Sequence, residues 1–102
     1  MSSKVVKAVV PFTQLGCWVV GGAANPDNIK PRDWDLIAPF EIWDLVAPII
    51  PANAVPNSFG GWKFIVDGIE IDLWPGSLAK FLANPHSQFI WHPLSGRRFQ
   101  LL

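Results

Sequence analysis

The dipeptide Asp67-Gly68 constrains the fold of this chain more than any other local feature. It separates two apolar runs, Trp62–Val66 and Ile69–Trp74, and Asp-Gly favours a two-residue β-hairpin turn. Because side chains alternate between the faces of a strand, the second run places Glu70 and Asp72 on one face. Its aliphatic residues lie on the other face. The sequence therefore predicts an antiparallel hairpin whose second strand has one apolar and one acidic face.

A second acidic strand is indicated by the stretch Asp33-Trp34-Asp35-Leu36-Ile37. The same alternation places Asp33 and Asp35 on one face and directs Trp34 and Leu36 toward a core. Two like charges at neighbouring positions of one face repel each other unless a cation lies between them. A cost of this kind is tolerated where it serves a function, and a divalent metal ion relieves it. The alternative is an exposed pair of acids on an edge strand.

A short apolar run, Cys17–Val20, precedes the pair Gly21-Gly22 and predicts a buried strand that ends abruptly. Glycine permits positive φ angles and lets another group approach the backbone closely. Backbone N–H groups in such a turn suit phosphate oxygens, while a tight turn without a ligand is the simpler interpretation. Cys17 is expected to be a buried small hydrophobic residue and not a nucleophile.

The remaining segments predict helices and a terminal hairpin. Lys4–Gln14 combines strand propensity with helical spacing, and we favour a helix that ends near Gly16. Asn25-Pro26-Asp27 is typical of a helix start, and Phe40–Ile50 has the spacing of an amphipathic helix. Further predictions are a loop or short edge strand over Ala52–Gly61, a short helix over Gly76–Ala83, and a hairpin formed by Phe89–Pro93 and Arg98–Leu102.

Length and composition indicate one globular domain spanning residues 1–102, since half of the residues are hydrophobic and 16% are charged. We expect an α+β fold: a small mixed sheet of four or five strands, helices packed on one face, and a C-terminal β-hairpin. The apolar runs are far shorter than the roughly 20 residues of a membrane span. The single cysteine and the lack of an apolar leader predict a cytoplasmic protein without membrane attachment.

Charge is distributed unevenly along the chain. Residues 33–72 hold seven acids and one base, a net charge of −6, and the remaining residues have a net charge of +6. An acidic centre with basic flanks suits a metal ion bound beside a phosphate-bearing ligand. Lys30 and Arg32 are candidates to contact a triphosphate, although solvated surface charge is the simpler interpretation of each.

Three predicted strands thus supply the parts of one site: Gly21-Gly22 from the first, Asp33 and Asp35 from the second, and Asp72 or Glu70 from the third. About three carboxylates on a rigid surface hold two divalent cations, Mg²⁺ or Mn²⁺, that bridge the phosphates of a nucleotide. Metal ions so placed neutralise charge on the transferring group and lower the pKa of an attacking hydroxyl. The chemistry implied is nucleotidyl transfer.

These pieces resemble the signature of the DNA polymerase beta-like nucleotidyltransferase superfamily, which has an apolar strand ending in Gly-Gly, then acid–apolar–acid–apolar, then a later acid between apolar residues. They occur in that order as Val19-Val20-Gly21-Gly22, Asp33-Trp34-Asp35-Leu36 and Ile71-Asp72-Leu73. The first two look most like the heads of CCA-adding enzymes and poly(A) polymerases. The third, with the Ser95-Gly96 turn, is more similar to the repair-polymerase branch. The resemblance implies that Asp33 and Asp35 hold both metal ions. It also implies that Asp72 completes the second site and helps to activate the incoming hydroxyl.

Two functions follow from the resemblance. The first is a minimal nucleotidyltransferase that moves NMP from a metal-bound NTP to a hydroxyl of an RNA, a protein or a small molecule. The alternative is a catalytically inactive relative that serves as a binding or regulatory module, like an antitoxin. The family's Gly-Gly usually opens a longer helix than Ala23–Arg32 can form, which favours the alternative, whereas the intact carboxylate set disfavours it. Without a second domain, the enzyme would need a homo-oligomer or a separate partner to choose its substrate. A chance motif in an unrelated fold is a third option.

Overall fold

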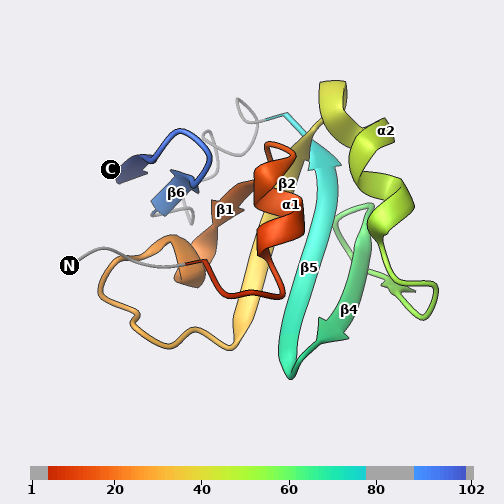
Figure 1. The fold of residues 1–102 in the computed structure, drawn as a ribbon, viewed down its shortest axis with the longest axis horizontal. Coiled ribbons are helices and arrows are strands. Elements are labelled where there is room, and N and C mark those ends of the chain that lie inside the picture. The colour runs from red at the N-terminus through yellow and green to blue at the C-terminus, as the bar shows by residue number, and fades with distance from the viewer. Residues whose placement is uncertain (1–4, 78–88, 101–102) are drawn as a thin grey trace.

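The computed structural model describes residues 5–77 and 89–100, and these form an α+β fold built on one mixed β-sheet. Within the described residues the sheet has seven strands in the order β3-β4-β5-β2-β1-β6-β7, and β2 and β5 are its parallel neighbours (Figure 1). The strands are β1 (Trp18–Val20), β2 (Asp33–Pro39), β3 (Val55–Pro56), β4 (Trp62–Val66), β5 (Ile69–Gly76), β6 (Phe89–His92) and β7 (Arg97–Gln100).

The sheet is wider than the four or five strands expected from the sequence. The C-terminal hairpin, β6 and β7, is confirmed, but it is not a separate attachment. It extends the main sheet because β6 pairs antiparallel with β1, with Val19 opposite Trp91 and Val20 opposite Ile90. The two-residue strand β3 forms the other edge, as the edge-strand alternative predicted.

The β4–β5 hairpin is confirmed with the expected two-residue turn. Asp67 and Gly68 both have positive φ angles, 52° and 79°, as a type I′ turn requires. The turn places Val66 opposite Ile69. Three residues before Val66 in β4, Lys63 lies opposite Asp72 in β5. Strand β5 then runs parallel to β2, which places Asp72 opposite Asp35.

The helices are shorter than predicted. They are α1 (Val10–Gln14) and α2 (Trp43–Val46), with 3₁₀ turns η1 (Gly21–Ala24), η2 (Phe40–Ile42) and η3 (Ala47–Ile49). The segment predicted as one helix over Phe40–Ile50 is helical from Phe40 to Ile49, but only Trp43–Val46 is α-helix and 3₁₀ turns flank it. Pro48 has no N–H to donate, and the segment continues past α2 as a tighter 3₁₀ turn. Leu45 and Ile49 point partly into solvent, with 59% and 42% of their surfaces exposed.

The helix start predicted at Asn25-Pro26-Asp27 is wrong. The Asn25 Oδ1 atom accepts a hydrogen bond from the Asp27 N–H at 2.9 Å, as a helix cap would, but only one turn follows, closed by the Asn28 N–H on the Asn25 carbonyl at 3.1 Å. Gly76 is the last residue of β5, so the short helix predicted from Gly76 does not begin there. Residues 78–83 of that prediction lie outside the described part of the chain.

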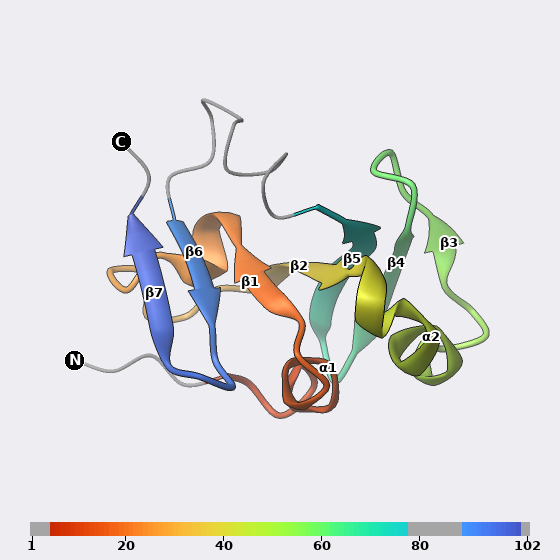
Figure 2. The same cartoon turned by 90° about the horizontal axis from the view of Figure 1, so that it is seen from above.

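The main core lies between the sheet and the two helices, which cover the same face (Figure 2). Phe12 from α1 and Val46 from α2 join sheet residues such as Leu36 and Ile71 in this core, and Cys17 is fully buried in it as predicted. A second, smaller cluster lies on the opposite face of the sheet and contains Val20, Ile37 and Ile90, with Trp18 and Trp74 packed against it. The α+β prediction with helices on one face is confirmed.

Candidate functional site

Four carboxylates gather on the sheet face that α1 and α2 leave uncovered. In the parallel pair β2–β5, Asp33 is paired with Glu70 and Asp35 with Asp72. Paired residues of neighbouring strands share a face and lie about 5 Å apart. Asp33, Asp35, Glu70 and Asp72 therefore form a compact two-by-two group, which we call the acidic cluster. Both candidates for the third carboxylate belong to it, with Asp72 beside Asp35 and Glu70 beside Asp33.

The members of the acidic cluster differ in burial and in charge environment. Asp33 is exposed, Asp35 is half-buried, and Asp72 is buried with 9% of its surface exposed. Burial and the negative charges of Asp72, Asp33 and Glu70 raise the pKa of Asp35 to about 6 from its ordinary value of 3.8. A bound cation would reverse this effect, because it favours the ionised carboxylate. A cation bound at Asp35 would therefore relieve the repulsion that the neighbouring acids exert on it.

Two side chains that the sequence did not single out contact Asp72. The Lys63 Nζ atom lies 3.9 Å from the Asp72 Oδ2 atom, and the positive charge of Lys63 also opposes the rise in the pKa of Asp35. The Asn57 Nδ2 group donates a hydrogen bond to the Asp72 Oδ1 atom at 3.3 Å. Counting back from the Asp67-Gly68 turn would have placed Lys63 opposite Asp72. No local pattern marks Asn57, which approaches from a loop.

The predicted glycine turn lies directly against the acidic cluster. Val20 at the end of β1 is paired with Asp35, and Gly21 follows with a φ of 71°. A Cβ atom at Gly21 would lie 3.0 Å from the Asp35 Oδ2 atom. A side chain there would be strained by the backbone and would crowd the carboxylate, so glycine keeps this approach open. Gly22 continues into the 3₁₀ turn η1, whose carbonyl at Gly22 accepts a hydrogen bond from Asn28.

The predicted phosphate contacts Lys30 and Arg32 are not drawn into the acidic cluster. Both side chains are exposed, and within residues 5–77 and 89–100 neither forms an ion pair. Arg32 contributes through its backbone, since its carbonyl accepts a hydrogen bond from the Glu70 N–H at 3.1 Å and so joins the starts of β2 and β5. Among the residues that the structure describes, the cation paired with a carboxylate of the cluster is Lys63.

Carboxylate oxygens are the ligands that Mg²⁺ and Mn²⁺ prefer, so the donor set of Asp33, Asp35 and Asp72 fits these ions chemically. Among the side chains that the structure describes, no three Asp, Glu, His or Cys residues form a ready-made metal group. The observations that bear on a cation here are the shared sheet face of these carboxylates and the raised pKa of Asp35.

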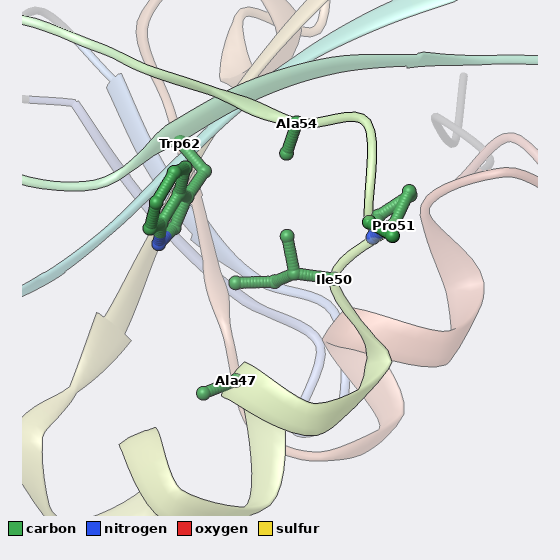
Figure 3. Close-up of a pocket in the computed structure, with 6 residues that line it drawn as sticks. Ala47, Ile50, Pro51, Ala54 and Trp62 are labelled. Atoms are coloured by element: carbon green, nitrogen blue, oxygen red, sulfur yellow. The ribbon is translucent and has the colours of Figure 1, made fainter.

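Two hollows lie away from the acidic cluster. A cavity of about 290 Å³ on the helix side is lined by Ala47, Ile50, Pro51, Ala52, Ala54 and Trp62 (Figure 3). Its lining contains no titratable side chain. A second hollow of about 370 Å³ lies at the ends of β2 and β5 and is lined by Trp18, Pro39, Phe40, Glu41, Gly76 and Ser77. Neither hollow includes a carboxylate of the cluster.

Comparisons with known proteins found no relative from which a function could be inferred. No protein-family model, curated protein or solved structure matches this chain. Within the described residues, none of the helices has both the length and the apolar character needed to cross a membrane.

Proposed function

We propose that this protein is a metal-dependent nucleotidyltransferase that transfers NMP from an NTP to a hydroxyl acceptor. The observation that carries the proposal is the register of three strands around Asp35. The antiparallel β1 delivers Gly21 to within van der Waals reach of the Asp35 carboxylate, and the parallel β5 places Asp72 directly opposite it. A glycine turn, an Asp-x-Asp strand and a third carboxylate thus converge although they are far apart in the sequence.

Each part has a role in this chemistry. Asp33, Asp35 and Asp72 would hold Mg²⁺ or Mn²⁺, which when bound supplies charge neutralisation on the triphosphate and acidifies the acceptor hydroxyl. The acceptor oxygen forms a bond to the α-phosphorus as the bond to pyrophosphate breaks, and the hydroxyl proton leaves toward Asp72. Asn57 and Lys63 fix the position of the Asp72 carboxylate. The backbone at Gly21 and Gly22 is free of side chains that would keep phosphate away.

One alternative function has its own structural support. Asp72 is already paired with Lys63 and Asn57, and the turn after Gly21 is a four-residue 3₁₀ turn instead of a longer helix. These two features favour a catalytically inactive module that binds or regulates a partner, as an antitoxin does. Such a module could retain the acidic cluster without turnover.

The test is an equilibrium titration of the protein with each NTP in the presence of Mg²⁺. We expect wild type to bind, and Asp33→Asn and Asp35→Asn to weaken binding at least ~10-fold, because each removes a ligand charge from the site. Asp44→Asn is the matched control, since Asp44 is an exposed acid on α2, on the other face of the sheet. Binding that is absent in wild type, or equal in wild type and Asp35→Asn, would refute the nucleotide site.

Pyrophosphate release with RNA, protein or small-molecule acceptors then separates the enzyme from the inactive module.

A further inference from the structure

Next to the acidic cluster, two aromatic rings form a stacked pair that is open to solvent. The ring centroids of Phe59 and Trp74 lie 4.7 Å apart with an interplanar angle of 29°. Trp74 is half-buried against the second apolar cluster, whereas 57% of the surface of Phe59 is exposed. Trp74 thus supports one face of the Phe59 ring, while much of the Phe59 surface remains exposed to solvent.

The loop that carries Phe59 is held firmly in place. Within this loop, the Asn57 Oδ1 atom accepts two hydrogen bonds, from the Phe59 N–H at 3.0 Å and from the Gly61 N–H at 2.9 Å. The Asn57 N–H donates to the Gly61 carbonyl at 3.0 Å. Gly61 is packed so tightly on β5 that a Cβ atom there would overlap the Leu73 carbonyl and the Trp74 backbone. Exposure of Phe59 is therefore a property of an ordered loop.

The same loop is joined to the acidic cluster. The Asn57 Nδ2 group that donates to the Trp62 carbonyl also contacts Asp72. Trp74 follows Asp72 by two residues in β5, so its side chain is on the same face about 7 Å further along the strand. Gly21 lies on the opposite flank of the cluster, against Asp35. Glycine turn, carboxylates and aromatic pair are thus arranged in sequence across one sheet face.

We propose that the exposed ring of Phe59, supported by Trp74, is the platform on which the base of the bound nucleotide stacks. This inference rests on the proposed function and adds the part of the substrate that the carboxylates cannot recognise. Stacking on an aromatic ring stabilises a bound base by ~1–3 kcal/mol and tolerates any base, because every base has a π-face. The triphosphate lies on the Gly21 side of the acidic cluster and the base on the Phe59 side.

The experiment compares two titrants, ATP and inorganic tripolyphosphate, at a fixed Mg²⁺ concentration. We expect Phe59→Ala to weaken ATP binding by ~5- to 150-fold, the range that corresponds to the loss of one stacked base, and to leave tripolyphosphate binding unchanged. Phe59→Trp should retain ATP binding, and Phe59→Leu, which keeps apolar bulk without a ring, should lose it as Phe59→Ala does. Phe40→Ala is the control, because Phe40 is 63% exposed but lies beyond the end of β2.

The outcomes separate this inference from the proposed function. If Phe59→Ala and Phe59→Leu bind ATP as wild type does while Asp35→Asn loses it, the nucleotide site stands and the platform is refuted. If tripolyphosphate binding falls in step with ATP binding in Phe59→Leu, the ring acts on the phosphate site and the inference is equally overturned. If wild type binds neither titrant, the proposed function fails and the platform fails with it.

Discussion

Asp35 lies where strand alternation and strand pairing concentrate negative charge. It has Asp33 two residues away on its own strand, Asp72 beside it on β5, and one cation, Lys63, acting on it from β4. The repulsion from the neighbouring acids outweighs the attraction of Lys63. Burial, together with this repulsion, raises the pKa of Asp35 to about 6. In the protein without metal, this carboxylate is therefore a source of instability at neutral pH.

The instability of Asp35 has a definite pH signature. Because the folded-state pKa is raised above the ordinary value of 3.8, the favourable contribution of protonated Asp35 is complete below about pH 4 and is lost as the pH rises through about 6. A shift of this size corresponds to ~3 kcal/mol in a fully buried site, and we expect ~1–2 kcal/mol because the side chain is half-exposed.

Chemical denaturation of the metal-free protein from pH 4 to pH 7 measures this difference. Asp35→Asn should gain stability relative to wild type across the interval and be more stable at pH 7, while Asp44→Asn should follow wild type. A stability difference between Asp35→Asn and wild type that does not change between pH 4 and pH 7 would contradict the charge environment described for Asp35.

At the same scale, the sequence predicted some members of the site and not others. Asp33 and Asp35 share a face because alternation is a local rule, and the turn at Asp67-Gly68 places Lys63 opposite Asp72 by counting. Asn57 could not be found in this way, since its hydrogen bond to Asp72 joins residues fifteen positions apart through a loop. The roles assigned to Asp33, Asp35, Asp72, Gly21 and Gly22 stay predictions.

Among the elements, strands followed their sequence patterns better than helices did. The runs that form β2, β4 and β5 have alternating faces and clear ends, so local chemistry sufficed to predict them. The parallel pairing of β2 with β5 is not encoded in either run alone and depends on the whole sheet. The helices were overpredicted because Pro48 lacks the N–H that a regular α-helix needs, and because the Asn25 segment closes into a single turn that no helix continues.

Gly61 offers a test of how closely the loop before β4 packs against β5. A Cβ atom at Gly61 would lie 2.0 Å from the Leu73 carbonyl oxygen and 2.5 Å from the Trp74 Cα atom, so backbone would have to move. We expect Gly61→Ala to lower the free energy of unfolding by ~2–3 kcal/mol or more, as overpacking against an immobile neighbour does. Thermal or urea unfolding measures the loss.

Gly22→Ala is the control for Gly61→Ala. The nearest atom to a Cβ there is the Asn28 Nδ2 atom at 3.7 Å, an ordinary contact, so stability should change by less than ~1 kcal/mol. Equal stability of Gly61→Ala and wild type would show that the loop does not rest on β5. The ordered position of Phe59 would then lose its basis.

The two faces of the sheet carry different features. The helices α1 and α2 close one face with the main core, and the opposite face holds the acidic cluster, the glycine turn and the aromatic pair. The terminal hairpin widens the sheet on the β1 side, a long-range pairing that no local pattern predicts. The larger apolar core thus lies on the helix side, whereas the opposite face combines a smaller apolar cluster with the repelling charges.

The central claim is that the acidic face binds a metal–nucleotide complex. Thermal unfolding tests this claim directly. Wild type and Asp35→Asn would be compared at pH 7 with and without Mg²⁺ and NTP. We predict that Asp35→Asn melts at a higher temperature than wild type without ligand. Mg²⁺ with NTP should raise the melting temperature of wild type, through binding to the folded state alone, and should not raise that of Asp35→Asn. A ligand-free Asp35→Asn that is less stable, together with a wild type that does not respond to Mg²⁺ and NTP, would show that the aspartate is structural and would contradict the claim.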